Sequence, residues 1–171
     1  MSRRQEGTRD RDRDTAQTFL ADVQAEFAFV TELGFGLVLA EQLPLSSFPH
    51  RRLSIAEHNT PLGECVVAIT YASQLVELTI THDPRGEISA TFRERSSPAP
   101  TGVDLFFVMR VAAPSAGIVV PTIYSRSTTS PREIVAQLSA LTATYAGPWL
   151  NGDHAAFSRA AAASIYRPAN T

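Results

Sequence analysis

The stretch CVVAITYASQLVELTITHDPRGEISATFRER, residues 65–95, contains the clearest structural pattern in the chain. From residue 76 onward apolar and polar residues alternate, which is the spacing of a β-strand with one buried face. The apolar positions are Val76, Leu78 and Ile80, then Ile88, Ala90 and Phe92. We therefore predict two antiparallel strands that are apolar on one side and polar on the other.

The residues between these two runs predict a tight turn. Asp83 can hydrogen-bond the turn backbone, Pro84 presets φ at the second position, and Gly86 accepts a positive φ. This combination is typical of a type I turn closed by a glycine bulge, and it predicts a β-hairpin.

A third strand is predicted before the hairpin, at residues 65–71, joined to it through Ala72-Ser73-Gln74. The run is rich in β-branched and apolar residues, and the set that best fits an inward face is Cys65, Val67, Ile69 and Tyr71. Because Cys65 is on that set and has no helix N-terminus behind it, we expect an inert buried thiol.

The rest of the chain supplies helices at both ends. Apolar spacing and caps predict helices at about residues 15–33, 130–146 and 153–166, and further strands at 35–43 and 103–111. The stretch 118–124 contains Pro121 and is predicted as an edge strand or no strand at all. A helix, a run of strands and then two helices indicate an α+β fold, with about five meander strands and helices packed on one sheet face.

Length and composition predict one soluble domain. The chain has 171 residues, of which 44% are hydrophobic and 19% charged. We expect a charged disordered tail at residues 1–14, a single domain at 15–167 and a short tail at 168–171. No apolar run approaches the ~20 residues of a membrane helix, no signal-peptide core is seen, and the single cysteine fits a reducing cytoplasm.

The net charge of the chain argues against one class of binding partner. The formal net charge of −2 argues against general nucleic-acid affinity. All 15 basic residues are arginine, which together with the many alanines suggests a GC-rich bacterial genome rather than a functional choice.

No motif for a catalytic, metal or cofactor site is present in the sequence. His50 and His58 lie eight residues apart in the irregular stretch 44–62, a spacing that matches no zinc signature. His82 beside Asp83 resembles an oriented base, but the turn already explains the aspartate. We expect no metal and no cofactor.

The candidate binding residues are polar positions of the sheet and the long loop. They are Arg51, Arg52, Thr79, Thr91, Arg93 and Arg95. If loop and sheet meet, the arginines would form a basic patch suited to an acidic protein surface. The competing interpretation, which we favour slightly, pairs Arg93 and Arg95 with Glu77 or Glu87 across strands.

Several segments together resemble a known group of proteins. They are Phe19–Phe35, Val67–Ser73, Asp83–Glu87 and Tyr145–Phe157. Their layout looks like that of small α+β bacterial proteins, some of which resemble immunity proteins of polymorphic-toxin systems. The likeness covers about residues 19–160, implies no particular functional residue, and differs in the longer 44–62 and 118–124 stretches.

These observations lead to three functional hypotheses. The first is a cytoplasmic, non-enzymatic protein-binding module, with an immunity-like inhibitor as its specific form, acting through the polar sheet face and the 44–62 loop. The second is a small enzyme or small-molecule binder that uses His50, His58 or His82. The third is a homodimer that buries the polar face against a second copy.

Overall fold

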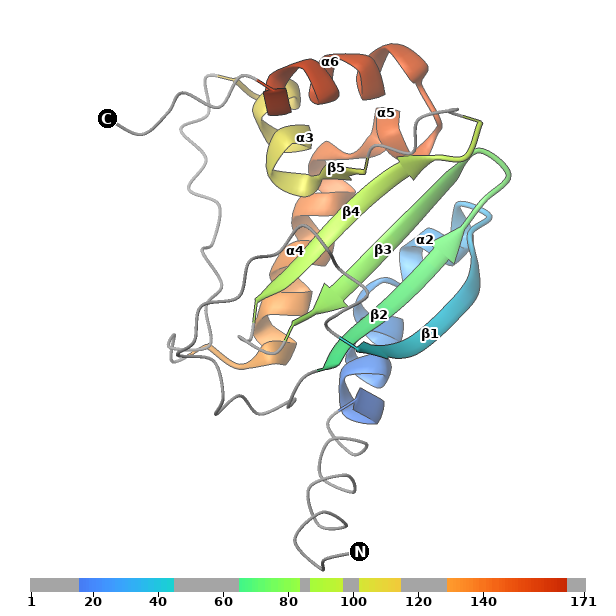
Figure 1. The fold of residues 1–171 in the computed structure, drawn as a ribbon, viewed down its shortest axis with the longest axis vertical. Coiled ribbons are helices and arrows are strands. Elements are labelled where there is room, and N and C mark those ends of the chain that lie inside the picture. Colours follow the sequence, from blue (N-terminus) through green and yellow to red (C-terminus); the bar gives the residue numbers. More distant parts are fainter. Residues whose placement is uncertain (1–15, 45–64, 84–86, 97–101, 115–128, 166–171) are drawn as a thin grey trace, which may run out of the picture.

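The computed structural model describes residues 16–44, 65–83, 87–96, 102–114 and 129–165. Within these residues the chain forms one antiparallel sheet of five strands in the order β1-β2-β3-β4-β5, so each strand pairs with its neighbour in sequence (Figure 1). This is the meander of an α+β fold, with helices from both ends of the chain, as the sequence predicts.

The strands are β1 (Gly36–Pro44), β2 (Cys65–Ala72), β3 (Val76–His82), β4 (Ile88–Glu94) and β5 (Val103–Asp104). The helices are a segment at residues 16–26 and then α2 (Ala28–Glu32), α3 (Leu105–Ala112), α4 (Pro131–Tyr145), α5 (Gly147–Leu150) and α6 (His154–Ile165).

The register of the central strands confirms the alternation read from the sequence. Leu78 lies opposite Tyr71 on β2 and Phe92 on β4, and Ile80 lies opposite Ile69 and Ala90. The burial of β3 alternates at every residue, with Val76, Leu78 and Ile80 wholly enclosed. Because opposed residues share a face, these pairs form continuous apolar rows across the sheet.

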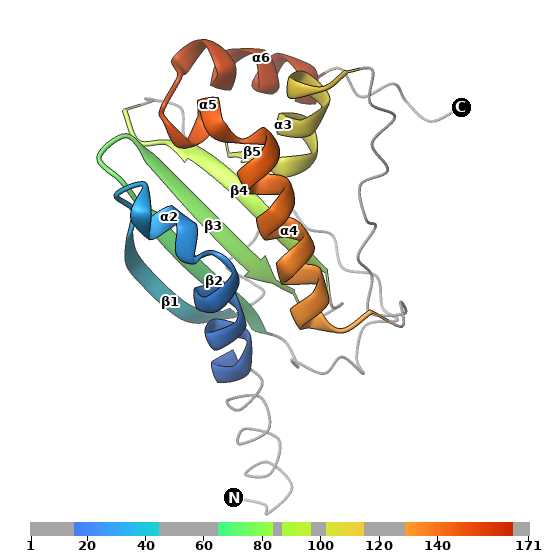
Figure 2. The ribbon, with the colours of Figure 1, turned by 180° about the vertical axis from the view of Figure 1, so that it is seen from behind.

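Helices cover the apolar side of the sheet. Seen from behind, α4 crosses that side diagonally and the N-terminal helical segment lies alongside it (Figure 2). The core between the two layers includes Phe19, Val23, Phe27, Val30, Ile69, Leu78, Ile80, Phe92, Ile134, Val135, Leu138 and Trp149.

The predicted N-terminal helix is interrupted once. It runs over residues 16–26, turns at Phe27 and resumes as α2, and Gly34 follows with a φ of 85°. Only glycine adopts that conformation freely, which explains why the helix ends there. Phe19 is buried, and Leu20, the next residue along the chain, is half-buried.

The predicted strand at residues 103–111 is wrong beyond its first two residues. Strand β5 ends at Asp104, and helix α3 begins directly after it. The Asp104 carboxylate accepts a hydrogen bond from the Phe106 backbone N–H at 2.8 Å, which caps the helix. Nearly every residue of the run is apolar. It therefore shows no spacing of apolar and polar residues that could distinguish a strand from a buried helix.

The start of α4 is formed as predicted. Ser130 accepts a hydrogen bond from the Glu133 N–H while the Glu133 carboxylate accepts one from the Ser130 N–H, which completes a capping box. The pKa of Glu133 is lowered because its carboxylate accepts hydrogen bonds from the Ser130 N–H and from the Ser130 hydroxyl. Helix α6 then packs against α3 and β5 at the far end of the sheet (Figure 1).

Some predictions lie outside the described residues. They are the tails at 1–14 and 168–171, almost all of the 44–62 loop, the 118–124 stretch and the turn residues 84–86. The ends of the predicted hairpin are described and confirm it: the Asp83 N–H donates to the Glu87 carbonyl, and the Glu87 N–H to Asp83 Oδ1, each at 2.9 Å.

Candidate partner-binding face

The side of the sheet away from the helices carries rows of polar side chains, which we call the polar face. Its members are Thr70, Glu77, Thr79, Thr81, Ser89, Thr91 and Arg93. The described helices lie behind the sheet or beyond its β5 edge, so none of them covers this face (Figures 1 and 2).

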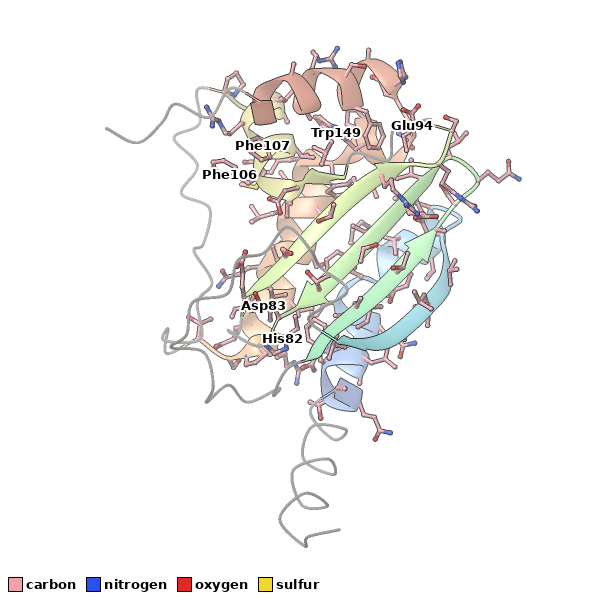
Figure 3. The ribbon with its side chains drawn as sticks, in the orientation of Figure 1. His82, Asp83, Glu94, Phe106, Phe107 and Trp149 are labelled. Carbon is pink, nitrogen blue, oxygen red and sulfur yellow. The ribbon has the colours of Figure 1, made fainter. Side chains whose placement is uncertain are left out.

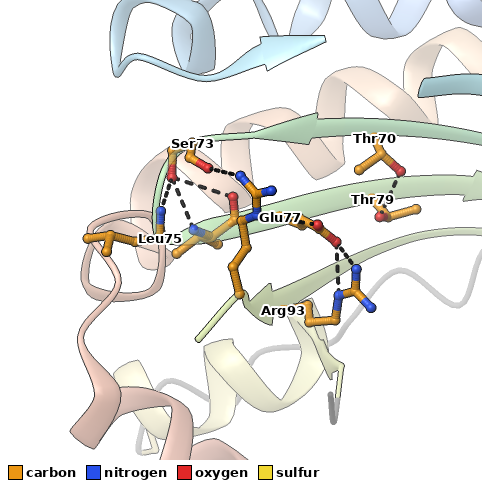
Figure 4. Close-up of polar contacts among 8 residues, drawn as sticks. Thr70, Ser73, Leu75, Glu77, Thr79 and Arg93 are labelled. Carbon is orange, nitrogen blue, oxygen red and sulfur yellow. Dashed lines mark hydrogen bonds and ion pairs between the residues drawn. The ribbon is translucent and has the colours of Figure 1, made fainter. Parts of the chain in front are cut away.

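Hydroxyl groups join neighbouring strands across the polar face. Thr70 Oγ1 and Thr79 Oγ1 are 3.0 Å apart (Figure 4). Thr81 Oγ1 and Ser89 Oγ are 2.8 Å apart. Thr91 lies opposite Thr79 and extends the first row onto β4. These contacts hold the hydroxyls in a fixed pattern on the sheet. Binding of a partner to them would lose less side-chain entropy than it would on a mobile surface.

The polar face is not equally accessible along its length. The threonines and Ser89 are half-buried, and Ala68, opposite Thr81, is buried. The side chains are more exposed at the C-terminal end of β4, where those of Arg93 and Arg95 are 46% and 49% exposed.

Glu77 holds both of these arginines. Arg93 Nε donates to Glu77 Oε2 at 2.9 Å, and its Nη2 contacts the same oxygen (Figure 4). Arg95 Nε lies 3.6 Å from Glu77 Oε1. The competing interpretation of the arginines is therefore confirmed: both pair with Glu77. Two guanidinium groups share one carboxylate, which leaves a local charge of about +1.

The turn between β2 and β3 fixes the second arginine. Arg95 Nη1 donates to the Ser73 carbonyl at 3.0 Å, and the Arg95 N–H donates to the Leu75 carbonyl at 2.8 Å. The Ser73 hydroxyl in turn accepts from the N–H groups of Leu75 and Val76 at 3.3 and 3.1 Å. We call Glu77, Arg93 and Arg95 the arginine cluster; backbone and side-chain contacts orient it.

His82 lies on the opposite side of the sheet. It lies at the end of β3 (Figure 3), shares the row of Val67 and Ile88, and is buried. Its ring centroid is 5.0 Å from that of Phe19. Its Nδ1 has no hydrogen-bond partner within the described part of the chain. Burial lowers the pKa of His82, and the charge of Asp83 opposes that shift.

The sequence contains a signal for the placement of His82 on the buried face. The inward series Val76, Leu78, Ile80 continues to residue 82 at the same spacing. His82 is thus enclosed under the N-terminal helical segment.

The remaining candidates are placed as follows. His50, Arg51, Arg52 and His58 lie outside the described residues, as does the side chain of Cys65. Among the residues that are described, no group of three or more His, Cys, Asp or Glu side chains could hold a metal ion. No helix in the same residues has both the length and the apolarity needed to cross a membrane.

Sequence reasoning missed one polar pair beside the arginine cluster. His154 Nδ1 lies 2.9 Å from Glu94 Oε2 and joins the start of α6 to the end of β4. Only the tertiary fold brings these residues together, because 60 positions separate them along the chain.

Comparison with known proteins gives no assignment: no family model, curated protein or solved structure matches the chain.

Proposed function

We propose that the protein is a non-enzymatic protein-binding module that uses the arginine cluster and the adjoining polar face. The observation that carries the proposal is the half-exposed pair Arg93 and Arg95, both held by Glu77 on a face that no described helix covers.

The charge of the cluster indicates the chemistry of the partner. Each guanidinium has five N–H donors, and pairing with Glu77 occupies only some of them. Arginine is enriched at the centres of protein interfaces, where its planar group binds carboxylates in two-point contacts. A partner surface with one or two carboxylates would complete the cluster and gain from its excess positive charge.

Rigid placement supports this use. The sheet, the Glu77 contacts and the Ser73 carbonyl restrict the arginine side chains before a partner arrives. Binding then loses less side-chain entropy, of the order of 0.5–1.5 kcal/mol for each side chain that is already ordered. Because His82 is enclosed beneath Phe19, and His50 and His58 lie outside the described residues, we base the proposal on this face and not on histidine chemistry.

A charge reversal tests the proposal. Immobilised wild type, Arg93→Glu and Arg159→Glu proteins would be exposed to extract from the native host, and retained proteins identified by mass spectrometry. Arg159 is an exposed arginine on α6 and provides the matched control. We expect one partner to bind wild type and Arg159→Glu and to be lost with Arg93→Glu. The purified partner should then bind about tenfold or more weakly to the reversed variant, since one buried charge contact contributes more than about 1.4 kcal/mol.

The proposal fails if every retained protein binds the three baits equally, or if none is retained above background. Circular dichroism must show that Arg93→Glu is folded, because the variant places two carboxylates side by side.

The more specific form of the proposal is an immunity-like inhibitor whose partner is a toxin. It rests on the resemblance of the segments between residues 19 and 160 to such proteins. Co-expression with the product of the neighbouring reading frame tests it directly. We expect wild type and Arg159→Glu to restore growth of cells that make that product, and Arg93→Glu to fail. A neighbouring product that is harmless by itself contradicts the specific form and leaves the binding proposal in place.

A further inference from the structure

The two edges of the sheet differ in length and in cover. Strand β5 has two residues, and α3 and α6 pack against it. Strand β1 has nine residues and forms the other edge, with β2 as its one neighbour in the described sheet (Figure 1). A long edge strand presents a row of backbone N–H and C=O groups that can pair with another strand.

The β1 edge is also apolar. Five large hydrophobic side chains are exposed in the described part of the chain, and four of them lie between residues 33 and 39. They are Leu33, Leu37, Val38 and Leu39, with Val38 the most exposed at 65%. The register of β1 on β2 shifts between Leu37 and Leu39, so Val38 has no opposed residue on β2. A bulge of this kind turns a side chain outward.

Charge is nearly absent along the edge. Between residues 33 and 44 the sequence LGFGLVLAEQLP contains one charged residue, Glu41. Natural edge strands stay unpaired through charged side chains, most often lysine, or through proline and bulges. Strand β1 has a bulge at Val38 and ends at Pro44, but charge, which repels an incoming strand most directly, is missing from its middle, Leu37 to Ala40.

We propose that β1 pairs antiparallel with β1 of a second copy of this chain, so that two sheets join edge to edge. A two-fold axis requires antiparallel pairing of the same strand and brings each residue near itself or its close neighbours. With the axis at residues 38–40, apolar side chains of one copy meet apolar side chains of the other. Within residues 33–44 a partner recognised by charge would find Glu41 alone, whereas self-pairing needs no charged residue.

The arrangement has a consequence for the polar face. A two-fold axis perpendicular to the sheet keeps corresponding faces on the same side, so the dimer would present two polar faces side by side. The dimer does not depend on the function proposed above, because β1 and the arginine cluster on β3 and β4 are different surfaces.

The first test is the molecular mass in solution. Wild type, Val38→Lys and Thr144→Lys would be measured by light scattering and sedimentation over a concentration series. Val38 is exposed, so lysine there should leave the monomer fold intact. Thr144 is exposed on α4 and controls for the added charge. We expect dimers for wild type and Thr144→Lys, and monomers for Val38→Lys.

A monomeric wild type throughout the series overturns the proposal. A dimer that survives Val38→Lys overturns it too, because the contact must then lie elsewhere. Arg93→Glu should stay dimeric, which separates this proposal from the function proposed for the polar face.

The second test locates the two-fold axis along β1. Single cysteines at positions 38, 39 and 40 would be placed in a Cys65→Ala background and oxidised, with Thr144→Cys in the same background as control. Residues opposed across an antiparallel pair have Cα atoms about 4.5–5.5 Å apart, within the range that a disulfide spans. We expect a covalent dimer that forms fastest at one of the three β1 positions and not at 144. Equal or absent cross-linking at all four positions contradicts the pairing.

Discussion

The two faces of the sheet belong to the same strands but are stabilised by different interactions. On β3, Leu78 and Ile80 are wholly buried on the helix side, whereas Thr79 and Thr81, on the same strand, are half-buried and make hydroxyl contacts with neighbouring strands. Apolar burial contributes about 25 cal/mol for each Å² removed from water, and an exposed polar pair about 1 kcal/mol or less. Stability therefore comes mainly from the helix side, and the polar side is free to serve recognition.

The largest test of this difference uses two neighbours on β4. Phe92 is wholly buried and Arg93 is exposed. Phe92→Ala should lower the free energy of unfolding by about 3–5 kcal/mol through lost burial and a cavity, and Arg93→Ala by about 0–1 kcal/mol because its ion pair is exposed to solvent. Urea denaturation of both variants measures the contrast. Similar losses for the two would show that the faces do not divide the stability in this way.

The second prediction concerns the layer of helices on the apolar face. The buried Ser139 hydroxyl of α4 donates to the Glu26 carbonyl at 2.5 Å and joins the two ends of the chain. Ser139→Ala leaves that carbonyl without this donor and should cost about 1–2 kcal/mol. Thr144→Ala removes an exposed hydroxyl that donates to the Ala140 carbonyl within the same helix, and should change stability by less than about 0.5 kcal/mol. Equal changes in the free energy of unfolding for the two variants would mean that the Ser139–Glu26 hydrogen bond does not stabilise the fold.

The third prediction uses the one buried histidine described on the apolar face. The folded protein holds the pKa of His82 below its ordinary value of 6.5. Below that pH the unfolded chain binds a proton that the folded chain does not, so stability should fall as pH decreases from 7 toward 5. His82→Gln should flatten this part of the profile, which thermal unfolding at several pH values would measure. An unchanged slope in the variant would assign the acid sensitivity to other groups.

The smallest effect belongs to the polar face. Thr70→Val, Thr79→Val and the double variant form a cycle around the 3.0 Å hydroxyl contact. We expect a coupling free energy of about 0.2–1 kcal/mol, as for other cross-strand pairs. A coupling well above this range would show that the threonine row contributes to folding as strongly as a core contact.

The sequence by itself determined the meander and its inward set. The period of two at residues 76–82 and 88–92, the pairing of these two strands as a hairpin and the start of the helix near residue 130 depend on residues close together in the chain, and the structure has all three where they were predicted. It also offered Glu77 or Glu87 as cross-strand partners of Arg93 and Arg95, and the structure shows that Glu77 pairs with both.

Only the tertiary structure decided features for which local pattern is ambiguous or silent. The run at 105–112 is apolar at nearly every position and became a helix because Asp104 caps it and α6 packs against it. The Glu94–His154 and Ser139–Glu26 contacts join residues 60 and 113 positions apart, which no local period encodes. The exposed apolar edge of β1 likewise appeared only once the sheet order was known, because a strand's sequence does not state whether another strand lies beside it.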